Sequence, residues 1–169
     1  MVKVLFVCLG NICRSPTAHG VFLARLEEEG LSDVVEVDSA GTADWHTGKA
    51  PDPRSQKAAL ARGVDISDLQ ARQVCEADFE EFDYVLAMDR SNYDDLKAIQ
   101  ARTGGTAPKL FLRAFGRSFD EHEVPDPYYG GEAGFRHVLD LIEDACDGLI
   151  LDIQQRLREK TTATVASDD

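Results

Sequence analysis

Residues 2–16 read VKVLFVCLGNICRSP, and this stretch decides the fold. Its first seven residues are mostly apolar and β-branched, which is typical of a strand buried on both faces. Gly10 and Asn11 interrupt the run, and Pro16 suits the first turn of a helix that ends before Gly30. A strand, a short loop and a helix in this order predict the first unit of a parallel sheet.

Further apolar segments alternate with helical patterns along the chain. Strands are predicted at 2–8, 34–39, 83–88 and 109–112, helices at 16–29, 54–62, 76–82, 90–102 and 132–159, and an irregular stretch at 113–131. The alternation predicts an α/β fold with a small four-stranded parallel sheet and helices on both faces, which is flavodoxin-like. We expect a single domain over 1–160 and a flexible C-terminal tail over 161–169.

The charge balance limits the partners. The 169 residues carry 18 Lys and Arg against 31 Asp and Glu, a net charge of −13. A surface with this much negative charge repels nucleic acid and anionic lipid. We therefore expect no nucleic-acid or membrane partner, and we expect a soluble monomer. No run reaches the ~18 apolar residues of a membrane helix and no signal-peptide pattern begins the chain, which favours a cytoplasmic location.

The loop after the first predicted strand pairs Cys8 with Arg14 and Ser15 at a fixed spacing. A loop that leads into a helix directs unpaired N–H groups and the positive end of the helix dipole at one spot, which predicts a local anion site. Arg14 supplies a planar fork that suits two phosphate oxygens. Gly10 and Asn11 are residue types that tolerate the positive φ that such a loop needs.

This setting favours a nucleophilic role for Cys8, because helix N-termini and cationic neighbours lower the pKa of a thiol. The alternative is that Cys8 simply ends a buried strand, which leaves Arg14 and Ser15 without a shared purpose. Phosphoryl transfer to sulfur also needs an acid for the departing oxygen. The candidate is Asp126, because Pro125 and Pro127 stiffen the backbone on either side of it.

Together these segments resemble the low-molecular-weight protein tyrosine phosphatase family over roughly residues 2–158. The segments that carry the resemblance are Val7–Pro16, Asp38–Thr42, Pro51–Arg54, Ala71–Gln73, Met88–Asn92 and Asp126–Tyr129. The resemblance implies a phosphotyrosine phosphatase that forms a phosphocysteine and uses no cofactor or metal. It implies phosphotyrosine-containing proteins as substrates and leaves open a cognate tyrosine kinase among them.

The resemblance also implies residue roles. Cys8 would be the nucleophile, Arg14 the phosphate clamp, and Asp126 the general acid and then the base. Ser15 would stabilise the thiolate, and Asn11 would hold the loop in shape. The implied phosphate-binding loop consists of Leu9, Gly10, Asn11, Ile12, Cys13, Arg14 and Ser15.

Trp45, Tyr129 and Cys13 each have two possible roles. The resemblance implies that Trp45 and Tyr128 form aromatic walls of the substrate pocket, although Trp45 could instead anchor its loop. Tyr129 is assigned either to the pocket or to packing. Cys13 would form a reversible disulfide with Cys8, or would fill the inside of the loop. 

One position departs from the family pattern. Many members carry a histidine before the segment Ala71–Gln73 that supports the phosphate loop, and this chain has Ser67-Asp68-Leu69-Gln70 there.

Related functions on similar scaffolds are less well matched. Arsenate reductases need a further closely spaced cysteine pair, and this chain has only Cys75 in its middle. Protein-arginine phosphatases of the family carry a threonine where this loop has Ile12, which favours phosphotyrosine here. Cysteine phosphocarriers do not need a hydrolytic acid, so Arg14 and Asp126 argue against that class.

Overall fold

The computed structural model describes the backbone of residues 1–128 and 130–168 and the side chains through Thr161. The sheet contains β1 (Val2–Cys8), β2 (Val35–Gly41), β3 (Tyr84–Ala87) and β4 (Lys109–Leu110). All pairs are parallel and the order is β2-β1-β3-β4. The chain therefore leaves β1 first toward one edge and later toward the other, which makes the carboxyl end of β1 the expected ligand site. The predicted fold class is confirmed.

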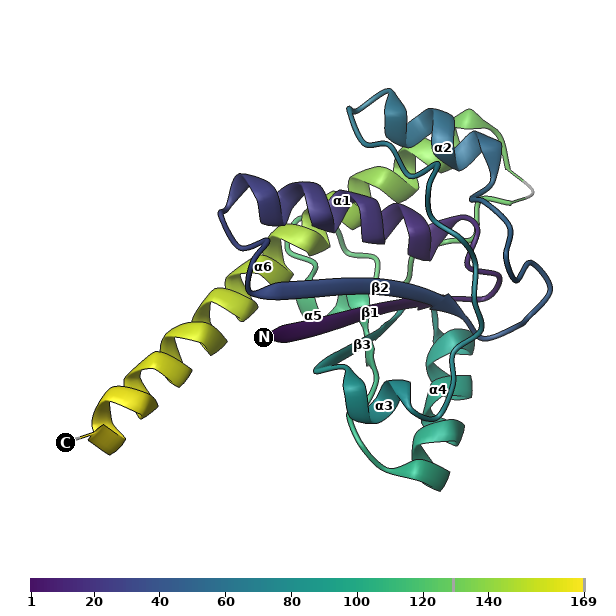
Figure 1. Ribbon diagram of the computed structural model, residues 1–169. Coiled ribbons are helices and arrows are strands. Elements are labelled where there is room, and N and C mark those ends of the chain that lie inside the picture. The colour runs from purple at the N-terminus through teal and green to yellow at the C-terminus, as the bar shows by residue number, and fades with distance from the viewer. Residues whose placement is uncertain (129, 169) are drawn as a thin grey trace.

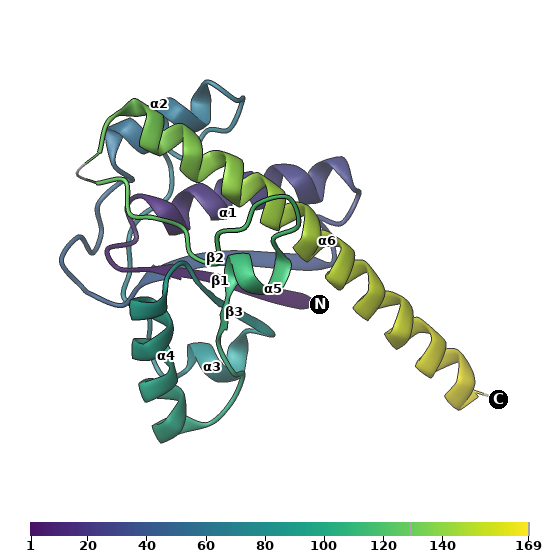
Figure 2. The ribbon, with the colours of Figure 1, turned by 180° about the vertical axis from the view of Figure 1, so that it is seen from behind.

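The helices are α1 (Arg14–Glu28), α2 (Pro53–Leu60), α3 (Asp78–Glu81), α4 (Arg90–Thr103), α5 (Phe111–Phe115) and α6 (Glu132–Asp168). Figures 1 and 2 show α1 on one side of the sheet and α3 and α4 on the other, and residues of α5 and α6 share the core on the α1 side. Alternate residues of β1 enter the two cores: Val4 and Phe6 face α1 and α6, and Leu5 and Val7 face α3 and α4. No helix in the part of the chain that the structure describes is long and apolar enough to cross a membrane.

The segment around β4 differs from the prediction. The expected strand over 109–112 ends at Leu110, and α5 takes up the last two residues of that strand and the first three of the stretch expected to be irregular. One helical turn brings Phe111, Leu112 and Phe115 into the core beside α6, whereas a strand would point the adjacent Phe111 and Leu112 to opposite faces. A Cβ on Gly148 of α6 would collide with the carbonyl oxygen of Phe115, so the missing side chain lets α5 pack this closely.

The start of α1 and the end of α6 also differ from the predicted bounds. Helix α1 begins at Arg14, two residues before the predicted start, so that Arg14 and Ser15 lie in its first turn. Helix α6 continues to Asp168, and its backbone over 161–168 is helical where the sequence predicts a flexible tail. In Figures 1 and 2 this end of α6 extends beyond the body of the molecule.

Candidate active site

The loop between β1 and α1 lies at the carboxyl edge of the sheet, and Asn11, Arg14 and Ser15 are all buried in it. Asn11 adopts a φ of 57°, in the left-handed region that its short polar side chain tolerates. The prediction for Gly10 was wrong, because its φ is not in this region. A Cβ at Gly10 would lie 3.0 Å from Cδ2 of His46, so a larger residue there would require the His46 side chain to shift.

Two groups of the loop contact the Cys8 sulfur. The hydroxyl of Ser15 lies 3.0 Å from Sγ, and the backbone N–H of Asn11 donates to Sγ over 3.2 Å. The Asn11 amide donates to the Ser15 hydroxyl over 2.8 Å. Because Ser15 thus already accepts a hydrogen bond, its own proton is available for Cys8 Sγ or for the carbonyl of Ala40, 3.3 Å away. Donors aimed at sulfur stabilise a thiolate.

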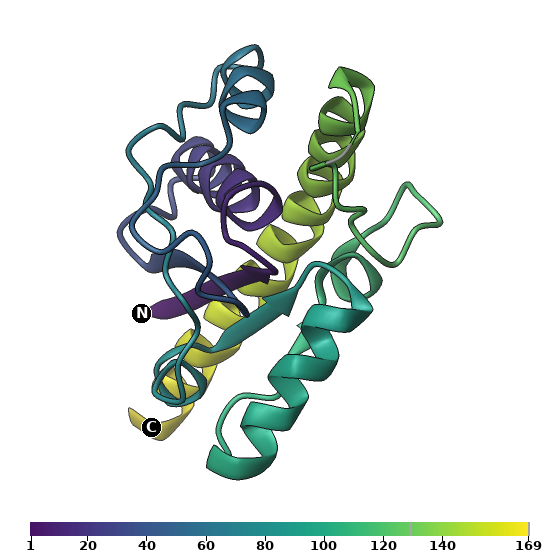
Figure 3. The ribbon, with the colours of Figure 1, turned by 90° about the vertical axis from the view of Figure 1, so that its right-hand side faces the viewer.

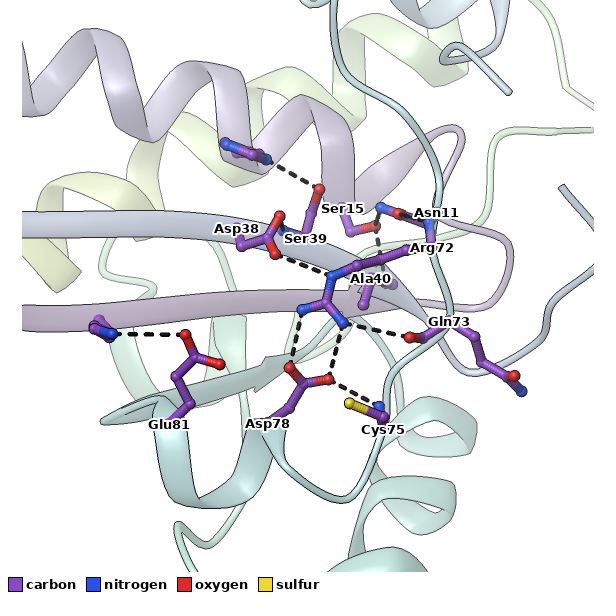
Figure 4. Close-up of polar contacts among 12 residues, drawn as sticks. Asn11, Ser15, Asp38, Ser39, Ala40, Arg72, Gln73, Cys75, Asp78 and Glu81 are labelled. Carbon is purple, nitrogen blue, oxygen red and sulfur yellow. Dashed lines mark hydrogen bonds and ion pairs between the residues drawn. The ribbon is translucent and has the colours of Figure 1, made fainter. Parts of the chain in front are cut away.

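Arg72 supports this loop from the side of β2. The side-chain oxygen of Asn11 accepts the backbone N–H of Arg72 over 3.0 Å. The Arg72 guanidinium in turn binds Asp38 on β2 and Asp78 on α3, each at 3.0 Å, as Figure 4 shows. Burial would lower the pKa of Arg72, but these two carboxylates outweigh burial and raise it. The segment 71–73 therefore holds the loop through its backbone, without a histidine side chain from residues 67–70.

A histidine of α1 makes a separate contact with β2. Nδ1 of His19 lies 3.0 Å from the hydroxyl of Ser39, and both side chains are buried. Burial lowers the pKa of His19, and the charge of Asp38 opposes this only in part. Neutral His19 thus fastens the first half of α1 to the strand beside it.

The Arg14 side chain is held from three directions. Its Nη1 donates to Asp89 over 2.6 Å and to the carbonyl of Val124 over 3.0 Å, and its Nη2 lies 3.6 Å from Asp126. Burial would lower the pKa of Arg14, but the charges of Cys8, Asp89 and Asp126 raise it overall. A guanidinium fixed in this way is ready to bind an anion above Cys8 with little loss of conformational entropy.

The predicted acid comes from a distant loop to the same place. Asp126 Oδ1 accepts the backbone N–H of Tyr128 over 3.0 Å, while Oδ2 faces Arg14. Pro127 between them is buried, which anchors the loop. Figure 3 shows the two loops, after β1 and before α6, at the same end of the sheet. The structure thus brings together three residues that the sequence separates by up to 118 positions.

A hollow of about 170 Å³ opens above these groups. It is lined by Cys8, Leu9, Gly10, Ile12, Cys13, Arg14, Trp45, His46, Asp126 and Tyr128. Trp45 and Tyr128 are both exposed side chains at the rim of this pocket. Tyr129, the third predicted aromatic residue, lies outside the described residues.

Cys13 lines the pocket with a buried thiol. Burial raises the pKa of Cys13 to about 12, and the negative charge of Asp52 adds to this, while a hydrogen bond with Ser55 opposes it. Cys8 and Cys13 are both free thiols in the structure.

Comparison with known proteins agrees with this geometry. Residues 3–163 match the model of the family described as low molecular weight phosphotyrosine protein phosphatase. The chain belongs to this family. A Synechocystis protein that carries the family's name is 45% identical over 92% of this chain and 99% of its own length. A low molecular weight protein-tyrosine-phosphatase of Streptomyces coelicolor is 39% identical over 92% of this chain and 95% of its own length.

Solved structures of phosphatases share the fold of this phosphatase. A protein tyrosine phosphatase from Entamoeba histolytica superposes with a TM-score of 0.86 at 40% identity, over 92% of this chain and 98% of that one. A Drosophila arginine phosphatase superposes with a TM-score of 0.83 at 30% identity, over 90% of this chain and 98% of that one. The scaffold is therefore common to phosphatases named for different phosphorylated residues.

Several contacts in the site were not predicted from the sequence. Asp89 lies two residues after the end of β3, so its position at the carboxyl edge was a usable signal for a partner of Arg14. His46 adjoins Trp45 in the chain and could have been assigned with it to the pocket. The carbonyl of Val124 and the pairing of Arg72 with Asp78 have no signal in the sequence, because they depend on how loops fold back.

Proposed function

We propose that this phosphatase hydrolyses phosphotyrosine in proteins through a phosphocysteine intermediate. The observation that carries the proposal is the meeting of the Cys8 sulfur, the Arg14 guanidinium and the Asp126 carboxyl group around one small pocket. A nucleophile, a fixed cation and a proton donor are the parts that two-step phosphoryl transfer requires.

In the first step the Cys8 thiolate attacks phosphorus and the bond between phosphorus and the tyrosyl oxygen breaks. Arg14 and the backbone N–H groups of the loop bind the non-bridging oxygens, where charge is concentrated in the transition state. Asp126 gives its proton to the departing tyrosyl oxygen. Asp89 and the Val124 carbonyl keep the Arg14 fork in position.

In the second step a water molecule attacks the phosphocysteine. Asp126, now ionised, accepts a proton from that water, and the bond between phosphorus and sulfur breaks. Phosphate leaves, and the Cys8 thiolate is restored beside its donors Ser15 and the Asn11 N–H. The proton of Asp126 is restored as well, so the cycle closes without another reactant.

Aromatic side chains at the rim support a phosphotyrosine substrate. Trp45 and Tyr128 can pack against the phenyl ring of a substrate while its phosphate contacts Arg14. Phosphoserine would hold its phosphorus too close to the backbone to reach Cys8 at the bottom of the pocket. Ile12 lines the pocket where arginine phosphatases of the family carry threonine, which favours phosphotyrosine over phosphoarginine.

The test is hydrolysis of a phosphotyrosine peptide and of phosphoarginine, with a metal chelator present throughout. We expect the wild type to cleave the peptide and Cys8→Ser to be inactive while it still binds phosphate. Rapid acid quenching of the wild type should trap a phosphoryl group on Cys8. Cleavage of phosphoarginine alone would overturn the substrate assignment, and turnover by Cys8→Ser would overturn the mechanism.

We also propose that Cys13 protects the nucleophile against oxidation. Peroxide converts the Cys8 thiolate to a sulfenic acid, and attack by the Cys13 sulfur forms the disulfide and releases water. Because the pKa of Cys13 is about 12, protection should become faster as the pH rises. After peroxide treatment, dithiothreitol should restore the activity of the wild type and much less of that of Cys13→Ala. Equal recovery would exclude this role.

We further propose a cytoplasmic, monomeric enzyme that acts on phosphoproteins and binds neither nucleic acid nor membrane. The net charge of −13 supports this, since it disfavours contact with other polyanions. A single functional unit over 1–160 is part of the same proposal, and removal of 161–169 should leave turnover unchanged.

A further inference from the structure

A second hollow lies beside the catalytic pocket, between α2 and the first turns of α6. It measures about 410 Å³, and its walls include Ala58, Ala61 and Phe135. Lys57 and Arg136 border it from the two helices, together with Glu132. Figures 1 and 2 show α2 alongside the beginning of α6, at the end of the sheet where the loop after β1 lies.

Arg54 connects the wall of this groove to the wall of the catalytic pocket. The guanidinium carbon of Arg54 lies 5.2 Å from the ring centre of Tyr128 and 4.9 Å from that of Phe135. Tyr128 lines the catalytic pocket and Phe135 lines the groove, and their ring centres lie at most about 10 Å apart. An extended peptide covers ~3.3–3.6 Å per residue, so residues two to four positions from a phosphotyrosine reach the groove.

Two exposed cations at the edge of the groove share a single acid. Lys57 and Arg136 share one carboxylate, at 3.2 Å and 3.8 Å from the two oxygens of Glu132. All three side chains are mostly exposed, and exposed ion pairs of this kind contribute little free energy, so exchanging partners costs little. Lys57, Arg136 and Glu132 therefore carry a local charge of +1, whereas the cations and acids around the whole groove are equal in number.

The other two cations of the groove already have their own acids. Arg54 makes two contacts with Asp52, and Arg62 pairs with Asp140 and Glu143. They shape the walls, whereas Lys57 and Arg136 are the groups that can accept a new carboxylate.

We propose that this groove binds acidic residues of the phosphoprotein substrate, two to four positions from the phosphotyrosine. The inference rests on the proposed function, because it needs the phosphotyrosine in the neighbouring pocket. Lys57 and Arg136 bind the carboxylates, and Phe135 with the two alanines contacts the aliphatic parts of the same segment. The groove thus selects substrates by sequence, and the catalytic pocket selects by the phosphorylated side chain.

Another hollow lined by cations lies elsewhere on the molecule, and it is the alternative binding site for an acidic peptide. It is formed by Arg90, Lys109 and Arg113 with Tyr93, between α4 and the start of α5. It shares no residue with the catalytic pocket. Arg113 is exposed there, so Arg113→Glu reverses one charge at the alternative site, which is the change that each half of the double groove variant makes. Arg102→Glu, at the far end of α4, controls for net charge alone.

The experiment compares the wild type with the double variant Lys57→Glu/Arg136→Glu on three substrates. One is a phosphotyrosine peptide with glutamates at the second to fourth positions on both sides, the second has serine at those positions, and the third is p-nitrophenyl phosphate. We expect kcat/KM of the double variant to fall about 10-fold on the acidic peptide, mainly through KM. The other two substrates should change less than about two-fold.

The controls separate the possible failures. Arg102→Glu and Arg113→Glu should keep the preference for the acidic peptide, and Lys57→Gln/Arg136→Gln should give a smaller loss than the glutamate pair. Equal losses on both peptides, or a loss in Arg113→Glu as large as in the groove variant, would overturn the proposal. Failure of the wild type to hydrolyse either peptide would instead overturn the proposed function.

Discussion

Two halves of the catalytic pocket are built in opposite ways. The half around Cys8 is buried, with Asn11, Arg14 and Ser15 at most 2% exposed and hydrogen-bonded to groups on β2, the loop after β3 and the loop before α6. The opposite half is open, with Trp45 68% and Tyr128 38% exposed. The phosphoryl group is the same in every substrate and meets the fixed half. The rest of the substrate varies and meets the half that has room to adapt.

The largest effect should follow from Arg14→Lys, in the buried half. Lysine cannot form the two-pronged contact with phosphate, and it leaves Asp89 and the Val124 carbonyl without their shared donor. Each transition-state donor is worth about 10²–10³-fold in kcat, so we expect a loss of about 10⁴-fold. The measurement is steady-state turnover of a phosphotyrosine peptide. Arg90→Lys, one residue after Asp89, is the control and should stay near wild type.

Asp126→Ala removes the proposed general acid. We expect kcat on a phosphotyrosine peptide to fall about 10³-fold, because a tyrosyl oxygen needs a proton as it departs. The loss should be smaller for p-nitrophenyl phosphate, whose leaving group is stable as an anion. A loss of the same size on both substrates would argue against proton donation by Asp126. Glu123→Ala, in the same loop, provides the matched control.

Two substitutions at Asn11 distinguish the effect of its positive φ from the effect of its side-chain hydrogen bonds. Both Asn11→Gly and Asn11→Ala lose the bonds to Ser15 and Arg72, and kcat should fall about 10-fold in each. Only alanine also meets the positive φ of 57°, so its free energy of unfolding should be lower than that of the glycine variant by about 1 kcal/mol. Urea titration measures the difference. Equal stability of the two variants would mean that φ imposes no strain here.

Trp45→Ala should have a smaller effect of another kind. An exposed side chain contributes little to the core, so the free energy of unfolding should stay within about 0.5 kcal/mol of wild type. We expect kcat/KM on phosphotyrosine peptides to fall a few-fold through lost contact with the phenyl ring. A large loss of stability would instead support the alternative in which Trp45 anchors its loop.

The smallest effect is on the pH dependence of stability. Burial depresses the pKa of His19 in the folded state, so unfolded chains bind the proton more readily. The stability that neutral His19 contributes is complete above the unfolded pKa of about 6.5 and is lost as the pH falls below it. His19→Gln keeps a partner for Ser39 without ionising, so it should lose less stability than the wild type between pH 7 and pH 5. Urea titrations at both pH values test this, and parallel losses would contradict it.

Most of the fold could be predicted from the sequence, because hydrophobic patterns act locally. The four strands and the alternation of strands with helices follow from short apolar runs and their turn residues. Helix α5 could not be predicted, since Phe111–Phe115 reads equally well as the end of a strand. Its helical form follows from packing against α6, at the point where Gly148 leaves room.

The sequence by itself determined the parallel α/β class, the family and the loop that carries Cys8 and Arg14, because those features lie in contiguous residues. Only the tertiary structure decided which groups from elsewhere reach that loop. Asp89 and Asp126 approach Arg14, and Arg72 supports Asn11, from positions 61 to 112 residues away in the chain. The physical reason is that parallel strands bring their carboxyl ends to one edge, so residues far apart in the chain share one buried site.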